Sequence, residues 1–241
     1  MFFPQSFSKW LIKTHLIQHT CPLCSELCLD PDNEFICASC KSALPVIENQ
    51  CFQCGLPLNK VDTTDISMRC GQCLVSPPAF DLCISPYHYA LPINQFITQL
   101  KFRHQLHYAR ILADLLITKI EQHAENLPEC IIPVPLHSSR LRQRGFNQAL
   151  EIARPIAKKY GIPLDTKSCS RIISTPPQME QDKRTRQKNV KNAFSVSPDF
   201  NYTHIAIVDD VMTTGHTLNE LSRVLREQGA KRIQVWATSR S

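Results

Sequence analysis

Short apolar runs alternate with longer amphipathic stretches from about residue 80 to residue 241. The runs Cys130–Val134 and Ile205–Val208 are brief, contain β-branched residues and are followed by turn or polar residues, which is typical of buried strands. Apolar residues at helical spacing predict helices over about 92–105, 107–124, 147–161 and 217–229, and another strand is expected within 83–90. Strands that alternate with helices predict an α/β fold, a parallel sheet flanked by helices.

Residues 1–79 follow a different pattern, in which cysteines rather than apolar repeats stand out. Eight of the 12 cysteines form four Cys-x-x-Cys knuckles, namely Cys21/Cys24, Cys37/Cys40, Cys51/Cys54 and Cys70/Cys73. Two residues between thiolates let both reach one tetrahedral ion, and two knuckles complete a four-sulfur structural site. Sequential pairing predicts two zinc ribbons with two structural Zn²⁺ ions. Pairing of the first knuckle with the third is the alternative, but sequential ribbons close smaller loops.

The metal is expected to stabilise this region, because its few aliphatic residues could not bury enough apolar surface to fold alone. The remaining cysteines, Cys28, Cys83, Cys130 and Cys169, have no knuckle partner and are expected to be buried small apolar residues. Adjacent prolines in "LVSPPAFDL" (74–82) indicate the end of the region. We therefore expect a double zinc-ribbon domain over 1–79 and a second domain over 80–241.

The N-terminal segment lacks the apolar core and small-residue cleavage site of a signal peptide, and no apolar run approaches the length of a membrane span. We expect a cytoplasmic protein without membrane insertion, whose thiols stay reduced and available for metal. The formal net charge of +6 suits anionic ligands without requiring nucleic acid.

Two adjacent carboxylates, Asp209 and Asp210, follow the apolar run 205–208 at what we expect to be the C-terminal end of a strand. Ligands bind at that end in open parallel sheets. The next residues, "TTGHT", lead into the helix expected from Thr217 and offer backbone N–H groups, hydroxyls and the positive end of a helix dipole. The pattern predicts a site for a sugar phosphate, with the phosphate in the loop and the ribose hydroxyls on the acids. Turn capping by the aspartates is the simpler alternative.

A basic loop is expected after the strand 130–134, because "PLHSSRLRQRGFNQ" carries Arg140, Arg142 and Arg144 close together. Guanidinium groups suit a multiply charged phosphate, such as pyrophosphate. A solvated basic surface loop is the alternative.

"AIVDDVMTTGHTL" (206–218) resembles the phosphoribosyl-pyrophosphate (PRPP) signature of type I phosphoribosyltransferases. Together with the knuckles, "QLKFR" (99–103), "RGFNQ" (144–148), "TPPQ" (175–178) and "RTRQKNVKNAF" (184–194), it makes the chain similar to the ComF (GntX) family along nearly its whole length. The resemblance implies a type I phosphoribosyltransferase-like domain behind an N-terminal double zinc ribbon. It also implies a link to DNA uptake or to the use of external DNA.

In such a transferase, Asp209 and Asp210 would hold the ribose hydroxyls of PRPP, and Arg140, Arg142 and Arg144 would face the leaving pyrophosphate with Mg²⁺. The 5′-phosphate would be bound by the loop residues Thr213, Thr214, Gly215, His216 and Thr217. Some purine transferases carry another aspartate where this chain has Thr213, so the resemblance implies no purine acceptor. The acceptor, and whether the chain is an active transferase at all, stay open.

The segment 170–194 is expected to be a mobile hood over the site or a basic linker. From His137 to Lys191 there are 13 Lys and Arg against 4 Asp and Glu, a surplus that could also follow a single-stranded DNA backbone. Aromatic stacking residues are few there, namely Phe146 and Tyr160. Two further hypotheses are therefore a non-catalytic accessory that binds single-stranded DNA and a zinc-ribbon regulator that senses a nucleotide.

Overall fold

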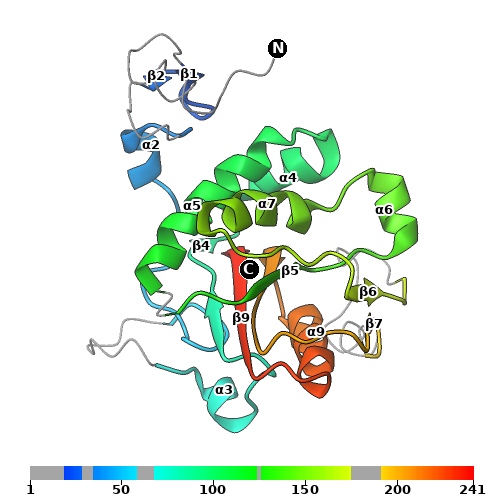
Figure 1. Ribbon diagram of the computed structural model, residues 1–241. Coiled ribbons are helices and arrows are strands. Elements are labelled where there is room, and N and C mark those ends of the chain that lie inside the picture. Colours follow the sequence, from blue (N-terminus) through cyan, green and yellow to red (C-terminus); the bar gives the residue numbers. More distant parts are fainter. Residues whose placement is uncertain (1–18, 29–34, 59–67, 124–125, 175–190) are drawn as a thin grey trace. The chain divides into compact units, whose positions relative to one another are not determined.

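The computed structural model describes residues 19–28, 35–58, 68–123, 126–174 and 191–241 (Figure 1). By its contacts the chain forms two compact units, residues 1–45 and 46–241. The "TPPQ" segment and most of the basic run, including the greater part of the expected hood, lie outside the described residues.

The smaller unit contains the first two knuckles. Strands β1 (His19–Thr20) and β2 (Leu27–Cys28) pair antiparallel, and the short helix α2 (Ala38–Ser42) begins just after Cys37. Between the strands the chain turns at Ser25, which has a positive φ of 63°.

The larger unit is built on a parallel sheet with the strand order β3–β9–β8–β5, and a short strand β4 also pairs with β9 (Figure 1). The bounds are β3 (Leu82–Ile84), β4 (Tyr87–His88), β5 (Cys130–Pro133), β8 (His204–Met212) and β9 (Arg232–Arg240). The two central strands β8 and β9 are buried along most of their length, because helices cover the sheet. The predicted parallel sheet flanked by helices is confirmed.

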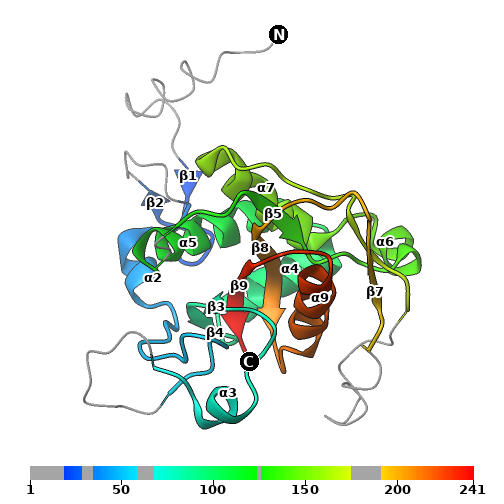
Figure 2. The same cartoon turned by 60° about the horizontal axis from the view of Figure 1, so that its bottom comes forward.

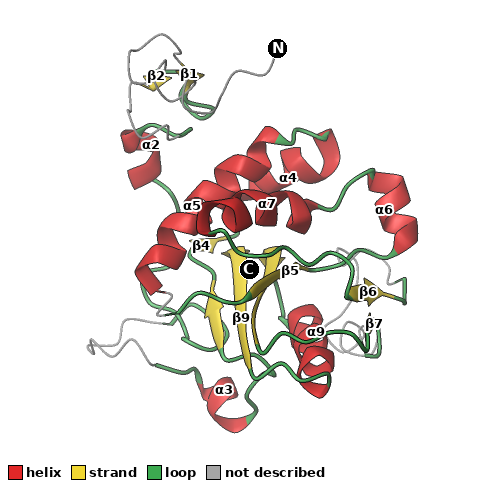
Figure 3. Ribbon diagram, in the orientation of Figure 1, coloured by secondary structure: helices red, strands yellow, loops and turns green. Residues whose placement is uncertain are grey.

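Helices cover both faces of this sheet (Figure 3). They are α4 (Ile93–Arg103), α5 (His107–His123), α7 (Gln148–Tyr160) and α9 (His216–Glu227). α5 and α7 pack on each other and on the sheet, whereas α9 packs beside β7 (Phe194–Val196), which forms an antiparallel pair with β6 (Cys169–Arg171) (Figure 2).

The predicted helix limits are confirmed by the caps of α7. The Asn147 side chain accepts a hydrogen bond from the Ala149 N–H at 3.0 Å, and Gly161 ends the helix with a φ of 66° that favours glycine.

Two predictions about local structure are wrong. β8 does not end at Val208 but continues through Met212, because β9 pairs with it as far as Met212↔Arg240. Asp209 and Asp210 therefore lie inside a strand. The expected basic loop forms a helix, α6 (Ser138–Arg144), whose N-cap is His137 and whose C-cap is Gly145 in the left-handed region.

The third and fourth knuckles belong to the larger unit. The short helix α3 (Gly71–Val75) begins after Cys70. The Gln53 side-chain amide donates to the Phe80 carbonyl at 3.2 Å, and the Cys83 N–H donates to the Phe52 carbonyl at 3.1 Å. The compact units thus divide between Pro45 and Val46, whereas the sequence motifs divide near residue 79.

Candidate functional site

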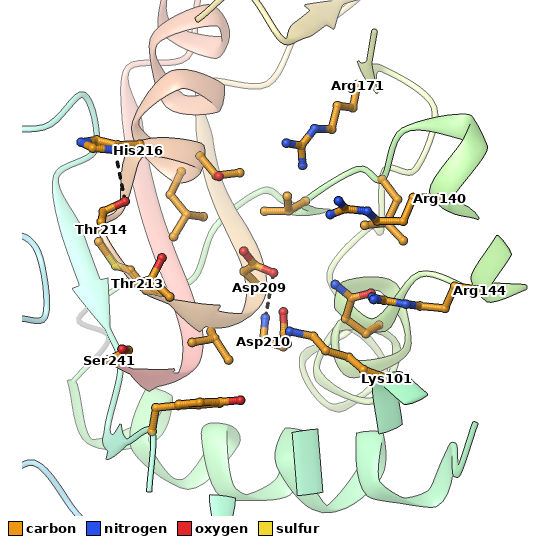
Figure 4. Close-up of a pocket in the computed structure, with 18 of the residues that line it drawn as sticks. Lys101, Arg140, Arg144, Arg171, Asp209, Asp210, Thr213, Thr214, His216 and Ser241 are labelled. Atoms are coloured by element: carbon orange, nitrogen blue, oxygen red, sulfur yellow. Dashed lines mark hydrogen bonds and ion pairs between the residues drawn. The ribbon is translucent and has the colours of Figure 1, made fainter. Parts of the chain in front are cut away.

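The carboxyl ends of the parallel strands meet at one edge of the sheet, and a cavity of about 620 Å³ lies there. Tyr89 follows β4, Leu136 follows β5, and Ser241 follows β9, while the end of β8 and the loop after it line the cavity centre. The volume falls in the range of small-molecule sites. Figure 4 shows the polar side chains that face this cavity.

The loop 213–217 joins β8 to α9 along the cavity wall. Gly215 is the N-cap of α9 with a φ of 76°, and a Cβ there would lie 2.7 Å from Cε of Met212. As a glycine, this N-cap residue has no side chain to accept a hydrogen bond from the first turn, and the Thr214 hydroxyl lies 3.1 Å from Nδ1 of His216. Backbone N–H groups at the start of α9, threonine hydroxyls and the helix dipole make this loop suited to a phosphate.

The acid pair differs in its two members. The Asp210 side chain is 4% exposed and forms an ion pair with Lys101 of α4. The carboxylate of Asp209 is partly buried beside the cavity and accepts a hydrogen bond from the Asp210 N–H at 2.9 Å. Asp209 is consequently the carboxylate that a ligand can reach, and Asp210 is already paired.

The pKa values of the two acids are displaced in opposite directions. Burial, and then the charge of Asp210, raises the pKa of Asp209 well above its ordinary value. Burial alone would also raise the pKa of Asp210, but the Lys101 ammonium and the side-chain hydrogen bonds to Asp209 and Lys101 bring it below its ordinary value. The pair therefore holds its first negative charge on Asp210.

Three arginines from two elements line the cavity across from the loop: Arg140 and Arg144 from α6, and Arg171 from β6 (Figure 4). The pKa of Arg144 lies below its usual value, chiefly because the side chain is partly buried. The charge of Asp210 raises this pKa, and the charge of Arg140 lowers it further. Burial and the neighbouring charge of Arg140 also lower the pKa of Arg171. Cations that disfavour one another in a cavity are suited to a multiply charged anion.

The structure brings most of the predicted site residues into this cavity. Those lining it are Arg140, Arg144, Asp209, Asp210, Thr213, Thr214, Gly215, His216 and Thr217. Arg142 does not line it, because Arg142 lies on the exposed side of α6.

Several cavity residues are not among those predicted from the sequence. Lys101, Phe102 and Arg171 line the cavity although they are distant in sequence from the acid pair. Lys101 and Phe102 belong to "QLKFR", so the motif itself was a signal, although its role was not evident. Phe102 is 56% exposed, and the Arg144 guanidinium lies 5.8 Å from its ring centroid.

The cysteine groups pair sequentially, as predicted: Cys21, Cys24, Cys37 and Cys40 form the first cysteine group, and Cys51, Cys54, Cys70 and Cys73 form the second. Within each group all four Sγ atoms lie within 4.8 Å of one another. The Cys24–Cys37 and Cys54–Cys70 Sγ distances are both 3.7 Å, close to the edge of about 3.8 Å expected for four sulfurs at 2.3 Å from zinc. Both groups fit a structural Zn²⁺ ion.

The remaining cysteines are buried as expected. Burial raises the pKa of Cys130 to about 11 and that of Cys169 to about 12, so both are neutral thiols at physiological pH.

The fold and cavity together define a phosphoribosyltransferase-type domain, and residues 147–239 match the family model described as "Phosphoribosyl transferase domain". The chain belongs to the family of the DNA utilization protein YhgH and competence protein F. It is 35% identical over 210 residues to DNA utilization protein YhgH of Salmonella typhi, which covers 86% of this chain and 90% of that protein. It is also 35% identical over 213 residues to competence protein F of Haemophilus influenzae, with the same coverage.

Among solved structures, the chain is similar to glutamine phosphoribosylpyrophosphate amidotransferase of B. subtilis, with 19% identity and a TM-score of 0.32 over 53% of this chain and 25% of that chain. A score this low adds nothing to the family assignment. Within the described residues, none of the helices has the length and apolar character needed to cross a membrane.

Proposed function

We propose that the cavity binds PRPP or a related phosphoribosyl ligand. One observation carries the proposal: the loop 213–217 and a group of arginines, each suited to an anion, lie on opposite sides of Asp209 within one cavity (Figure 4). The loop 213–217 suits a single phosphate, and the arginines Arg140, Arg144 and Arg171 suit a pyrophosphate. PRPP carries a phosphate at one end, a pyrophosphate at the other and ribose hydroxyls between them, so its charges match this order.

Each polar residue has a defined role in this proposal. The Asp209 carboxylate accepts hydrogen bonds from the ribose hydroxyls, and Asp210, fixed by Lys101, holds Asp209 in place through its N–H. As pyrophosphate leaves, the ribose gains positive charge that the acid pair stabilises, while the arginines offset the charge on the leaving group. The described residues assign no acceptor.

Mg²⁺ is expected to accompany PRPP. Asp209 is the carboxylate within reach of the cavity, so its oxygen would hold the ion together with oxygens of the phosphoribosyl ligand and water. Such a site suits the preference of Mg²⁺ for few protein ligands. When bound, the ion would offset negative charge on the pyrophosphate.

Calorimetric titration with PRPP, ribose 5-phosphate and pyrophosphate tests the roles separately. Without added Mg²⁺, Asp209→Asn should weaken the binding of PRPP and ribose 5-phosphate by about 1.5–3 kcal/mol, on the scale of a lost charged hydrogen bond, and leave pyrophosphate binding unchanged. Arg144→Ala should weaken pyrophosphate and PRPP, whereas the matched variant Arg142→Ala on the exposed side of α6 should bind both as the wild type does. Equal loss of pyrophosphate and ribose 5-phosphate in Asp209→Asn would contradict the ribose role.

A second candidate function, the handling of single-stranded DNA, is supported by the exposed rings at the cavity. Tyr89 and Phe102 line the cavity and are 38% and 56% exposed, and Arg144 lies beside Phe102. Such rings stack on bases without regard to sequence, and arginine adds a cation–π contribution. The names of the relatives, which refer to DNA utilization and competence, agree with a role in the use or uptake of DNA.

Oligothymidine binding tests this candidate. Phe102→Ala should weaken binding by about 1–3 kcal/mol if a base stacks there, and Leu74→Ala, an exposed apolar residue of α3 outside the cavity, is the matched control. Equal affinities for the two variants would exclude stacking on Phe102.

The basic run 183–188 lies outside the described residues and needs its own variant. Replacement of Lys183, Arg184, Arg186 and Lys188 by alanine should lower DNA affinity and flatten its dependence on salt. An unchanged salt slope would remove the run from the DNA interface.

A further inference from the structure

Arg240 connects the second cysteine group with the end of β8. The residue closes β9, is 8% exposed and directs its guanidinium to main-chain oxygens. Its Nε donates to the carbonyl of Cys54 at 3.4 Å, and its Nη1 donates to the carbonyl of Met212 at 3.1 Å and to the main-chain oxygen of Ser241 at 2.8 Å. One side chain thus contacts a metal-ligating knuckle and the residue just before the phosphate loop.

Met212 is held from a second direction by the same knuckle. The Cys83 thiol donates to the Met212 sulfur at 3.5 Å, and the Cys83 N–H donates to the carbonyl of Phe52, inside the knuckle 51–54. The methyl group of Met212 in turn lies against Gly215, where even a Cβ would be only 2.7 Å away. The contacts therefore run from the knuckle through Met212 to the N-cap of α9.

The positive charge of Arg240 also suits its place beside the second cysteine group. A zinc ion with four thiolates is a net anion, and a guanidinium at the carbonyl of one of its ligand residues is a suitable counter-charge. A bound metal also fixes the knuckle backbone that Arg240 and Cys83 contact.

We propose that Arg240 is a positioning residue through which metal binding at the second cysteine group holds the loop 213–217 in the geometry that binds phosphate. The identity of the ligand rests on the proposed function, but the mechanical connection does not. The first cysteine group belongs to the other compact unit.

Amide hydrogen exchange over 211–217 tests the connection directly, and titration with ribose 5-phosphate tests its effect on binding. Arg240→Ala should keep two zinc ions by elemental analysis, exchange these amides about tenfold faster and bind ribose 5-phosphate about tenfold more weakly, because hydrogen bonds from a charged donor are lost. Arg240→Lys keeps a cation near Met212 and should recover part of both effects. Lys231→Ala, an exposed residue just before β9, is the control and should match the wild type.

The metal is tested by a pair of ligand substitutions. Cys73→Ser should lose one zinc ion and speed exchange over 211–217, whereas Cys40→Ser should lose the other ion and leave that exchange unchanged. If Cys73→Ser unfolds the larger unit, Arg240→Ala with its zinc retained decides the question.

Unchanged exchange over 211–217 in Arg240→Ala, or equal acceleration in Cys40→Ser, would overturn the inference. Failure of the proposed function looks different: the wild type would then bind no ribose 5-phosphate, while the exchange experiment would still report on the connection.

Discussion

The two cysteine groups use the same turn in different surroundings. In the first, the Cys21 N–H donates to the Glu26 carbonyl at 2.8 Å and the Ser25 N–H donates back to Cys21 at 2.9 Å. The second repeats these bonds from Cys51 to Leu56 and from Gly55 to Cys51, each at 2.8 Å. The turn residues Ser25 and Gly55 have nearly the same φ, 63° and 65°. Metal-binding geometry alone therefore does not distinguish the groups.

What differs is the contact each turn makes. A Cβ at Gly55 would lie 3.0 Å from Sγ of Cys83 and 3.2 Å from Cβ of Ser85, so the turn packs directly on the strand region of the larger unit. Ser25 carries an exposed side chain at the same position of its turn. The same knuckle turn thus forms the centre of the smaller unit at Cys21 and, thirty residues later at Cys51, a part of the larger, transferase-type unit.

Loss of a metal ligand should give the largest difference between the groups. The protein should contain two zinc ions per chain, and both Cys21→Ser and Cys51→Ser should lose one. Because zinc binding supplies folding free energy, Cys21→Ser should unfold only the smaller unit, while Cys51→Ser should destabilise the larger unit by several kcal/mol. Elemental analysis together with thermal unfolding checks this, and loss of stability in the larger unit of Cys21→Ser would break the comparison.

The glycine of the second turn should give the next largest effect. Gly55→Ala places a methyl group against Cys83 and Ser85 and forces a non-glycine residue into the left-handed region. We expect the free energy of unfolding to fall by about 1–3 kcal/mol, as in other overpacked sites. Denaturant unfolding of the larger unit measures it. Gly71→Ala, where an added Cβ meets nothing within 4 Å, is the matched control and should cost less.

Ligand affinity of the cavity should depend on pH, and this dependence gives a further test of whether the first cysteine group influences the larger unit. Burial and the charge of Asp210 raise the Asp209 pKa, so Asp209 is neutral below that pKa and becomes a carboxylate acceptor above it. Affinity for ribose 5-phosphate should therefore increase as pH rises through the Asp209 pKa. The contribution of Asp209 to stability has the opposite sign: the unfolding free energy falls as pH rises from the unfolded to the folded pKa.

Asp209→Asn should remove both trends. Calorimetry at several pH values measures the affinity of the wild type relative to this variant, and the ratio cancels the titration of the ligand's own phosphate. Lys101, Arg140 and Arg171 also surround Asp209, so the comparison is best made with these residues unchanged. Cys24→Ser in the first group should leave unchanged the pH at which half of the change in ribose 5-phosphate affinity has occurred. A shifted midpoint in Cys24→Ser would show that the first group influences the cavity.

Local patterns were enough to predict much of this molecule from its sequence. The strands 130–134 and 205–208, the caps of α7, the loop 213–217 and the sequential knuckles each depend on residues close in the chain. The end of β8 could not be predicted in this way, because aspartates disfavour strands locally and only the pairing with β9 extends β8 through them. α6 was missed because its arginines gave no apolar repeat.

The cavity shows the same limit. Asp209 and the loop 213–217 lie within one short motif, whereas Lys101 and Arg171 reach the cavity from α4 and β6 by tertiary folding. Aromatic residues are few in the basic stretch 137–191, and the exposed rings at the cavity, Tyr89 and Phe102, precede that stretch in the chain. The attachment of the second knuckle pair to the sheet likewise depends on contacts with Cys83 and Arg240 that spacing does not reveal.

The smallest expected effect concerns Ser25, the counterpart of Gly55. Ser25→Gly relieves a non-glycine residue of its positive φ but also gives the unfolded chain more freedom, so these two contributions oppose each other. Because the Ser25 side chain is exposed, no packing is lost, and we expect zinc retention by the first group to change by less than about 1 kcal/mol. Competition with a chelator measures it. A small effect would mean that a non-glycine residue at this position of the turn costs little by itself. The larger cost of Gly55→Ala would then be assigned to the contact with Cys83 and Ser85. If Ser25→Gly weakened zinc retention by as much as Gly55→Ala lowers the free energy of unfolding, turn conformation rather than surroundings would be what separates the two groups.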